Sequence, residues 1–335
     1  MQIDPLLRAL ADPTRLRIMR LLSAMELAVR ELAQVLGQSQ PRVSRHIRIL
    51  CEAGLVERRK EGAWVFLRNS LQEPEAPLLA KATAQLLDAA EQDDAGFAQV
   101  CREDRLQLSA IRSSREAMAE AYFARHAGEW DQLRNLHAPD EPVEAALVSA
   151  LSAASLGRVL DVGTGTGRIA ELLAGKADHV TGLDKSPEML RMARARLQGF
   201  PADRVDLVQG EFTDLPFAPG DFDTVLFHQV LHYAQEPGVV LAEAARVVQP
   251  GGRLAVVDFA SHDREELRER HAHARLGFSD EQMQALFADA GFDSDVPLTL
   301  SGSPLTVKIW TGRRAAAASN PSAASHLPAA GKAPR

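Results

Sequence analysis

Residues 159–167 read VLDVGTGTG, and this stretch decides the fold of the larger part of the chain. A short apolar run, typical of a buried strand, leads into three alternate glycines and then a helix. Glycines at such a turn let the backbone approach a ligand at the N-terminus of the helix that follows. The dinucleotide fingerprint is Gly-x-Gly-x-x-Gly, whereas the spacing here is Gly-x-Gly-x-Gly, so NAD is disfavoured.

Apolar runs alternate with helical segments from Arg158 onward, which predicts a doubly wound, mostly parallel sheet. The runs are Val159–Val162, His179–Leu183, Val205–Val208, Phe222–Phe227 and Leu254–Val257. Two later runs, Val296–Leu300 and Leu305–Thr311, are close enough to form a terminal antiparallel hairpin.

Polar side chains and turns follow these runs at the positions that a nucleoside site requires. Asp184 ends the second run, where a carboxylate can accept from both hydroxyls of a ribose. Gly210-Glu211-Phe212-Thr213-Asp214-Leu215-Pro216-Phe217 follows the third, and Pro250-Gly251-Gly252 turns into the fifth. Four ordered motifs are far more specific than one glycine loop.

This series resembles the S-adenosylmethionine (SAM)-dependent methyltransferases with the Rossmann-like fold, over residues ~115–313. The Leu-Pro-Phe segment and the closing hairpin resemble the ubiquinone-type and related small-molecule members. The resemblance implies that SAM or S-adenosylhomocysteine (SAH) is the cofactor or effector. The implied cofactor-binding residues are Asp161, Gly163, Thr164, Gly165, Gly167, Asp184, Lys185, Glu211, Phe212 and His228.

The same resemblance implies a role for each part of the site. Asp161 and the loop 163–167 would hold the methionyl part, and Asp184 the ribose. Glu211 would accept from the adenine amino group, with a backbone N–H from Phe212. On the preceding helix, Tyr122 and Trp130 either close over the ligand or are core aromatics.

Catalytic residues are not identified by any motif. The Asn/Asp-Pro-Pro-aromatic motif of amino-methylating enzymes is absent after the fourth run, and residues 228–233 read HQVLHY instead. His228, His232 and Tyr233 are the candidates, since His can act as a general base near neutrality. The alternative is that these histidines are structural. His271 and His273, two apart, lie on different sides of a helix and predict no metal site.

The first 72 residues read as short helices followed by a hairpin. Asp12-Pro13 begins a helix, Gly37 ends another, and Ser39 caps a third. Strands at 55–57 and 63–68 flank an expected turn at Lys60-Glu61-Gly62. This order predicts an α+β winged helix-turn-helix.

Basic and polar side chains on the third of these helices and on the hairpin are the candidate DNA contacts. Arg and Gln read base edges in the major groove, whereas charge on the wing favours the DNA backbone. The alternative is a solvated basic helix. The candidates are Gln40, Arg42, Ser44, Arg45, His46, Arg48, Arg58, Arg59 and Lys60.

Several motifs of this region resemble the ArsR-type bacterial repressors, over roughly residues 4–70. They are Ala11-Asp12-Pro13-Thr14-Arg15, Glu31-Leu32-Ala33, Ser39-Gln40, Val43-Ser44-Arg45-His46 and Ala53-Gly54-Leu55-Val56. Members bind double-stranded operator DNA as homodimers through terminal helices, which implies helix 78–92 in a dimer seam. Metal-sensing members carry two cysteines where Ala28 and Arg30 stand here, so we expect no metal site.

Charge and composition agree with this division. Residues 1–72 hold 12 Lys/Arg against 7 Asp/Glu, whereas the rest hold 26 against 38, so only the N-terminal region suits a polyanion. The sequence predicts a winged helix over 1–72, connecting and dimerisation helices over 73–127, a methyltransferase-like domain over 128–313 and a disordered tail over 314–335. With no apolar stretch of about 20 residues and no signal peptide, we expect a cytoplasmic protein without membrane contact.

Two functions follow from these resemblances. The first is a transcriptional regulator whose SAM- or SAH-binding domain controls operator binding, with methionine-cycle genes suggested by the resemblance. The alternative is an active SAM-dependent small-molecule methyltransferase with an autoregulatory DNA-binding region. Nucleic-acid methylation is disfavoured, because the acidic larger domain offers no basic groove.

Overall fold

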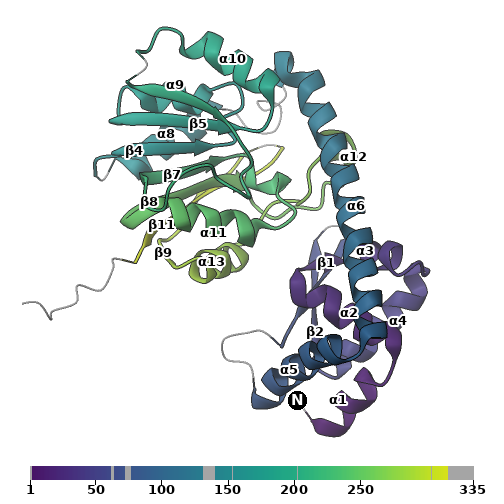
Figure 1. Cartoon of the computed structure of the whole chain (residues 1–335). Helices are drawn as coiled ribbons and strands as arrows, with labels where there is room; N and C mark the ends of the chain where they lie inside the picture. The colour runs from purple at the N-terminus through teal and green to yellow at the C-terminus, as the bar shows by residue number, and fades with distance from the viewer. Residues whose placement is uncertain are drawn as a thin grey trace, which may run out of the picture.

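A computed structural model describes residues 2–61, 64–71, 77–130, 140–152, 154–201, 203–302 and 304–315. Residues 2–93 form a small head and residues 140–315 a larger body around one sheet. The long helix α6 (Ala95–His126) runs from one to the other (Figure 1). The tail predicted to be disordered lies outside the described residues beyond Ala315.

The head is a winged helix-turn-helix, as the sequence predicts. Its three-stranded antiparallel sheet has the order β1-β3-β2. The elements are α1 (Ile3–Leu10), α2 (Pro13–Ala24), β1 (Leu27–Ala28), α3 (Val29–Val35), α4 (Gln40–Glu52), β2 (Val56–Glu61), β3 (Trp64–Asn69) and α5 (Leu78–Asp93). Strand β2 runs through Lys60 and Glu61, so the prediction of a turn at these two residues was wrong.

The two helix starts predicted in the head differ in how the first N–H groups of the helix are bonded. The Asp12 carboxylate accepts from the backbone N–H of Arg15 at 3.1 Å and caps α2. Ser39 stands at the N-cap of α4, but its side chain makes no capping bond; its carbonyl accepts from the N–H groups of Arg42 and Val43 instead.

The body is an eight-stranded sheet with helices on both faces. Its strand order is β10-β11-β8-β7-β4-β5-β6, with β9 also paired to β11. Strands β8, β7, β4, β5 and β6 are parallel, and β11 is antiparallel to β8 and β10. The strands are β4 (Arg158–Val162), β5 (His179–Asp184), β6 (Val205–Gln209), β7 (Phe222–His228), β8 (Val248–Phe259), β9 (Phe292–Ser294), β10 (Leu298–Leu300) and β11 (Val307–Arg314).

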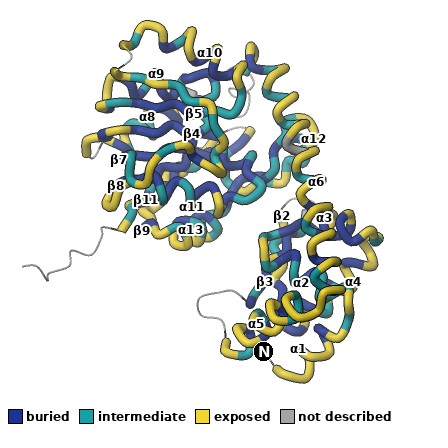
Figure 2. Tube along the Cα trace, viewed as in Figure 1, coloured by how far each residue is buried: buried dark blue, intermediate teal, exposed yellow. Residues whose placement is uncertain are grey.

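Alternate residues of the strands enter two separate cores, because side chains alternate between sheet faces. Val159 packs under α8, α9 and α10, whereas Leu160 packs under α11 and α13. The central strands β4, β5, β7 and β8 are therefore buried on both sides (Figure 2). The helices are α8 (Asp140–Leu151), α9 (Arg168–Ala174), α10 (Pro187–Leu197), α11 (Pro237–Val247), α12 (Glu266–His271) and α13 (Asp280–Asp289), with single 3-10 turns η1 (Ala127–Glu129) and η2 (Leu231–Tyr233).

The sheet reverses its winding between β4 and β7, since β5 and β6 follow on one side and β8 on the other. Ligands of open α/β sheets bind at the carboxyl ends of the strands at such a point. Across the part of the chain that the structure describes, no helix combines the length and the apolar character that crossing a membrane requires.

Candidate functional site

A cavity of about 660 Å³ lies at the carboxyl ends of β4, β5, β6 and β7. Nine of the ten predicted cofactor-binding residues line it. They are Asp161, Gly163, Thr164, Gly165, Asp184, Lys185, Glu211, Phe212 and His228. The tenth, Gly167, is not part of the cavity wall, because it lies at the start of α9 and packs against Ala193 and Leu197 of α10.

The glycine loop is held open toward the cavity by its backbone bonds. The N–H groups of Gly163 and Thr164 both donate to the carbonyl of Leu183, and the Thr164 hydroxyl donates to Asp161 at 2.6 Å. Gly163 has φ +71°, and a Cβ there would lie 2.4 Å from Cγ2 of Val230. Only glycine lets the two strand ends approach this closely.

Asp184 ties the end of β5 to this loop. Its two carboxylate oxygens accept from the N–H groups of Gly165 and Ser186, each at 2.8 Å. Burial raises the pKa of Asp184, while these N–H donors oppose the change. Each oxygen keeps a second lone pair that can accept from a ligand hydroxyl.

Lys185 joins the cavity to α6. Its ammonium lies 2.8 Å from Glu211 and also pairs with Glu120 of α6. Burial lowers the pKa of Lys185, but the bonds to the two carboxylates outweigh it, so the pKa is raised. Glu211, predicted to accept from the adenine amino group, and Glu120 of α6 therefore both pair with the Lys185 ammonium.

Helix α6 itself forms one wall of the cavity, through Glu120, Phe123 and small residues between Ala117 and Ala124. Trp130 also lines the cavity and lies beside Gly165, as expected for a residue that closes over the ligand. Tyr122 is not among the residues of the wall, and its hydroxyl lies 2.8 Å from Nδ1 of His271 at the end of α12. The hypothesis that Tyr122 closes over the ligand is therefore not supported.

Two of the three catalytic candidates line the cavity, and the third does not. His228 and Tyr233 line the cavity, and burial raises the pKa of Tyr233 well above its ordinary value, so its hydroxyl stays protonated. His232 is buried outside the cavity wall, with Nδ1 2.7 Å from the fully buried Asp258.

Gln229 is a cavity residue that the sequence did not identify. It has φ +52°, is only 6% exposed, and its side-chain oxygen receives no hydrogen bond within the described residues. A buried acceptor without a donor is costly unless a ligand supplies one. The sequence carried one signal for this residue, because Gln229 directly follows β7, at the point where the strand order of the sheet reverses.

These groups fit an adenosylated amino acid. Carboxylates lie at the ends of β5 and β6, the glycine loop lines the cavity at the end of β4, and an unsatisfied acceptor lies at the end of β7. The cavity extends past them to the rings of Phe123, Trp130 and Tyr233, whose centroids lie 4.9–6.4 Å apart.

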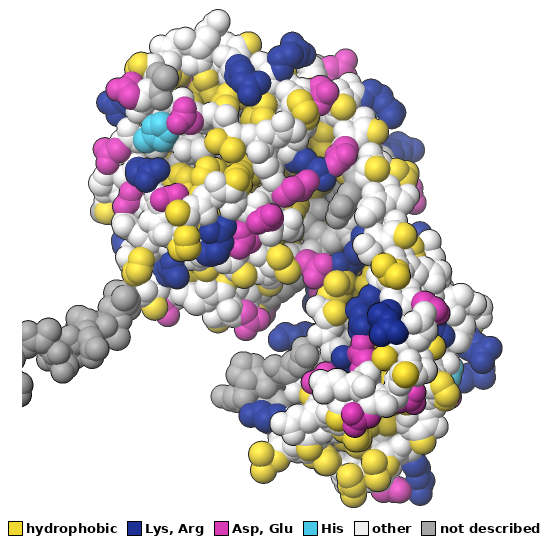
Figure 3. All heavy atoms as spheres, in the orientation of Figure 1, with side chains coloured by type: hydrophobic (Ala, Val, Ile, Leu, Met, Phe, Trp, Pro, Cys, Tyr) yellow, Lys and Arg dark blue, Asp and Glu magenta, His cyan; other side chains and the backbone are white. Residues whose placement is uncertain are grey.

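Helix α4 presents the predicted DNA-contacting face. Gln40, Arg42, Ser44, Arg45 and Arg48 are exposed, as are Arg58 and Lys60 on β2. Blue Lys and Arg side chains are visible on the head in Figure 3.

Two side chains predicted to contact DNA lie beside carboxylates of the head instead. His46 is half-buried and lies 3.7 Å from the Asp12 carboxylate. Arg59 donates to Glu26 at 3.1 and 3.2 Å, on the opposite face of β2 from Arg58. The remaining seven candidates are exposed.

The two cysteines are placed as core residues. Cys101 is buried and Cys51 half-buried, and burial raises the pKa of both thiols. Thiolate is the form that binds soft metals. We therefore expect purified protein to show no uptake of arsenite, zinc or cadmium at the head in a competition assay with a chromophoric chelator; release of DNA on addition of any of these ions would contradict this prediction.

Two family models match the chain. One, described as a bacterial regulatory protein of the arsR family, covers residues 12–58, and the other, a methyltransferase domain, covers residues 160–256. A demethylmenaquinone methyltransferase of Clavibacter sepedonicus is 33% identical over 156 residues, which are 46% of this chain and 63% of that protein. A ubiquinone biosynthesis O-methyltransferase of Xylella fastidiosa is 31% identical over 153 residues, 43% of this chain and 60% of that protein.

The chain thus spans less than two-thirds of either relative. Among solved structures, a Haloferax volcanii complex with the Trm112 methyltransferase activator matches with a TM-score of 0.49 and 22% identity, covering 58% of this chain and 97% of that one. The family matches coincide with the winged helix of the head and with strands β4 to β8 of the body. The chain therefore joins an ArsR-family helix-turn-helix domain to a methyltransferase domain of the Rossmann-like fold.

Proposed function

We propose that the protein is a DNA-binding transcriptional regulator in which SAM or SAH, bound by the methyltransferase domain, changes the affinity of the head for operator DNA. The ribose would lie on Asp184 and the adenine on Glu211. Because β5 and β6 then hold the nucleoside, the methionyl end extends toward β4 and β7, where Gly163, Gly165 and Gln229 lie.

The observation that carries this proposal is the course of α6. Its 32 residues span about 48 Å. Near its start, Asp104 accepts from Arg17 of α2 at 2.6 and 2.8 Å. Near its end, Glu120 and Phe123 line the cavity. One continuous helix thus contacts the DNA-binding fold and lines the cavity proposed to hold the ligand.

The proposal is tested by titrating a duplex, selected from random sequence by the ligand-free protein, in the presence of SAM, SAH or neither. Coupling free energies between sites typically change affinity about 5- to 150-fold. We expect a change in this range with one ligand form and a smaller one with the other. Equal operator affinity in all three conditions would overturn the proposal.

Within this proposal, α4 reads base edges and β2 contacts the DNA backbone. Arg45→Ala should weaken binding to the selected duplex by about 5- to 150-fold and relax its sequence preference. Lys60→Ala should weaken all duplexes alike and reduce the salt dependence of binding. Fluorescence anisotropy with the selected and a scrambled duplex, at several salt concentrations, separates the two; equal losses on both duplexes for Arg45→Ala would show that α4 does not read sequence.

The second candidate function is methyl transfer to a small molecule. It is favoured by the space beside Phe123, Trp130 and Tyr233, beyond the groups assigned to the nucleoside. SAM supplies an electrophilic methyl group on sulfur, and catalysis then requires mainly that the acceptor be positioned in line. Release of SAH from radiolabelled SAM with a panel of phenolic and quinol acceptors tests it.

A further inference from the structure

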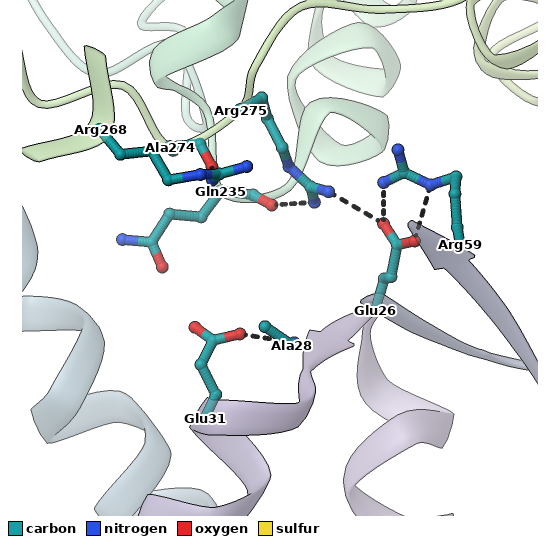
Figure 4. Close-up of polar contacts among 8 residues, drawn as sticks. All are labelled: Glu26, Ala28, Glu31, Arg59, Gln235, Arg268, Ala274 and Arg275. Atoms are coloured by element: carbon teal, nitrogen blue, oxygen red, sulfur yellow. Dashed lines mark hydrogen bonds and ion pairs between the residues drawn. The ribbon is translucent and has the colours of Figure 1, made fainter. Parts of the chain in front are cut away.

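The head and body make a second contact beside α6, centred on one carboxylate. Glu26, between α2 and β1, accepts from Arg275 of the body at 3.1 Å and from Arg59 of β2 at 3.1 and 3.2 Å (Figure 4). Arg275 is only 3% exposed. The guanidinium of a body residue is therefore buried against the base of the wing.

The same arginine covers an aromatic ring of the head. Its guanidinium lies 4.3 Å from the ring centroid of Phe66 on β3, and Arg59 lies 5.3 Å from the same ring. Phe66 is buried by this arrangement. Arginine stacked on an aromatic ring and paired with a carboxylate makes both contacts through one planar group.

Glu26 balances the two guanidinium groups that meet here. Burial raises the pKa of Glu26, but Arg275 and Arg59 outweigh burial and lower it, so the carboxylate stays ionised. Without this negative charge, Arg275 and Arg59 would lie over the ring of Phe66 with no carboxylate between them. Arg275 is almost without solvent, and a third guanidinium, that of Arg268, lies 5.9 Å from the same ring centroid. Removing one partner of a buried ion pair is strongly unfavourable for the charge that is left.

Arg275 is also hydrogen-bonded to a chain segment that lines the cavity. Its backbone N–H donates to the carbonyl of His232 at 2.9 Å, and its side chain donates to the carbonyl of Gln235 at 2.7 Å. Both carbonyls belong to the 228–236 segment, which lines the cavity through His228, Gln229, Val230 and Tyr233. The segment ends at Glu236, which pairs with Arg112 of α6.

We propose that the contact of Arg275 with Glu26 and Phe66 is the surface through which the methyltransferase domain controls the wing. A ligand that displaces the 228–236 segment moves both attachments of Arg275 and changes its hold on Glu26. Glu26 in turn fixes Arg59, which stands in β2 between Arg58 and Lys60, two exposed basic residues of that strand. This inference rests on the proposed function, since it assigns the route by which ligand reaches the DNA-binding surface.

The test compares Glu26→Gln with a matched control, Glu243→Gln. Glu26 and Glu243 are 25% and 19% exposed, and both are paired with arginine, but Glu243 and its partner Arg246 lie within the body. For each protein, calorimetry gives the Kd of SAM and SAH without DNA, and anisotropy gives the operator Kd with and without ligand. The ratio of the two operator Kd values is the coupling factor.

We expect Glu26→Gln to reduce the coupling factor to below twofold while the Kd of the free protein for ligand changes by less than threefold. Glu243→Gln should retain the wild-type coupling factor. Arg275→Lys, which keeps the charge but loses the paired donors to Glu26 and Gln235, should behave as Glu26→Gln and provides a second test if one variant is unstable by circular dichroism.

Wild-type coupling in folded Glu26→Gln and Arg275→Lys would overturn this route and leave the proposed function standing. A coupling factor of one in the wild-type protein would instead overturn the proposed function itself. Since coupling is reciprocal, bound operator must change ligand affinity by the same factor, and the variants must lose that change too.

Discussion

Asp184→Ala is expected to weaken the binding of both SAM and SAH by roughly 100-fold or more. The substitution removes the acceptor proposed for the ribose hydroxyls and leaves the N–H of Gly165 without its partner, which loosens the glycine loop. Hydrogen bonds to a charged group contribute about 1.5–3 kcal/mol each, so the loss should be about 3 kcal/mol or more, roughly 100-fold in Kd. Isothermal titration calorimetry measures it directly.

Asp206→Ala is the control, since Asp206 lies on the adjacent strand β6 but is exposed and outside the cavity. Ligand-free operator binding should survive in Asp184→Ala, because the head is unchanged. Because burial raises the pKa of Asp184, wild-type ligand affinity should decline on acidification at a higher pH than an exposed aspartate would give. Unchanged SAM affinity in Asp184→Ala would remove the ribose assignment.

The second large effect is expected on the oligomeric state of the protein. Four apolar side chains on α1 and α5 are more than half exposed: Ile3, Leu7, Leu78 and Leu86. Hydrophobic side chains gather over this end of the head (Figure 3). A second copy would cover them and place two α4 helices on half-sites about one helical turn apart. This is the homodimer that the ArsR resemblance implies.

Leu7→Glu combined with Leu86→Glu should convert a dimer into a monomer. Linked sites raise apparent affinity by roughly 10²–10⁴, so operator binding should fall at least about 100-fold. Sedimentation velocity gives the state of assembly, and anisotropy the operator Kd. Val296→Glu, an equally apolar and more exposed position in the body, is the control. A double variant that stays dimeric would place the seam elsewhere.

The sequence alone determined the elements and most of the cavity. Period-two and helical patterns are local, so β4 with its glycine loop, β5 ending at Asp184 and helix α4 follow from a few neighbouring residues. The methyltransferase resemblance implied that Asp161 and Glu211 belong to one site, and both line the cavity because parallel strands place their carboxyl ends at one edge. The predicted DNA-contacting face of α4 is exposed for the same reason, since Val43, Ile47 and Leu50 fix which side is buried.

Only the tertiary structure decided which polar groups face each other across long separations. Tyr122 and Phe123 are neighbours in one helix, yet one meets His271 and the other lines the cavity, because a helix turns about 100° per residue and its rotation is set by packing. Arg59 is an ordinary wing residue in sequence, and only the structure shows that it donates to Glu26 and that Arg275 of the body donates to the same carboxylate. Such contacts depend on how two separately folded units are oriented, and neither hydrophobic periodicity nor motif spacing contains that orientation.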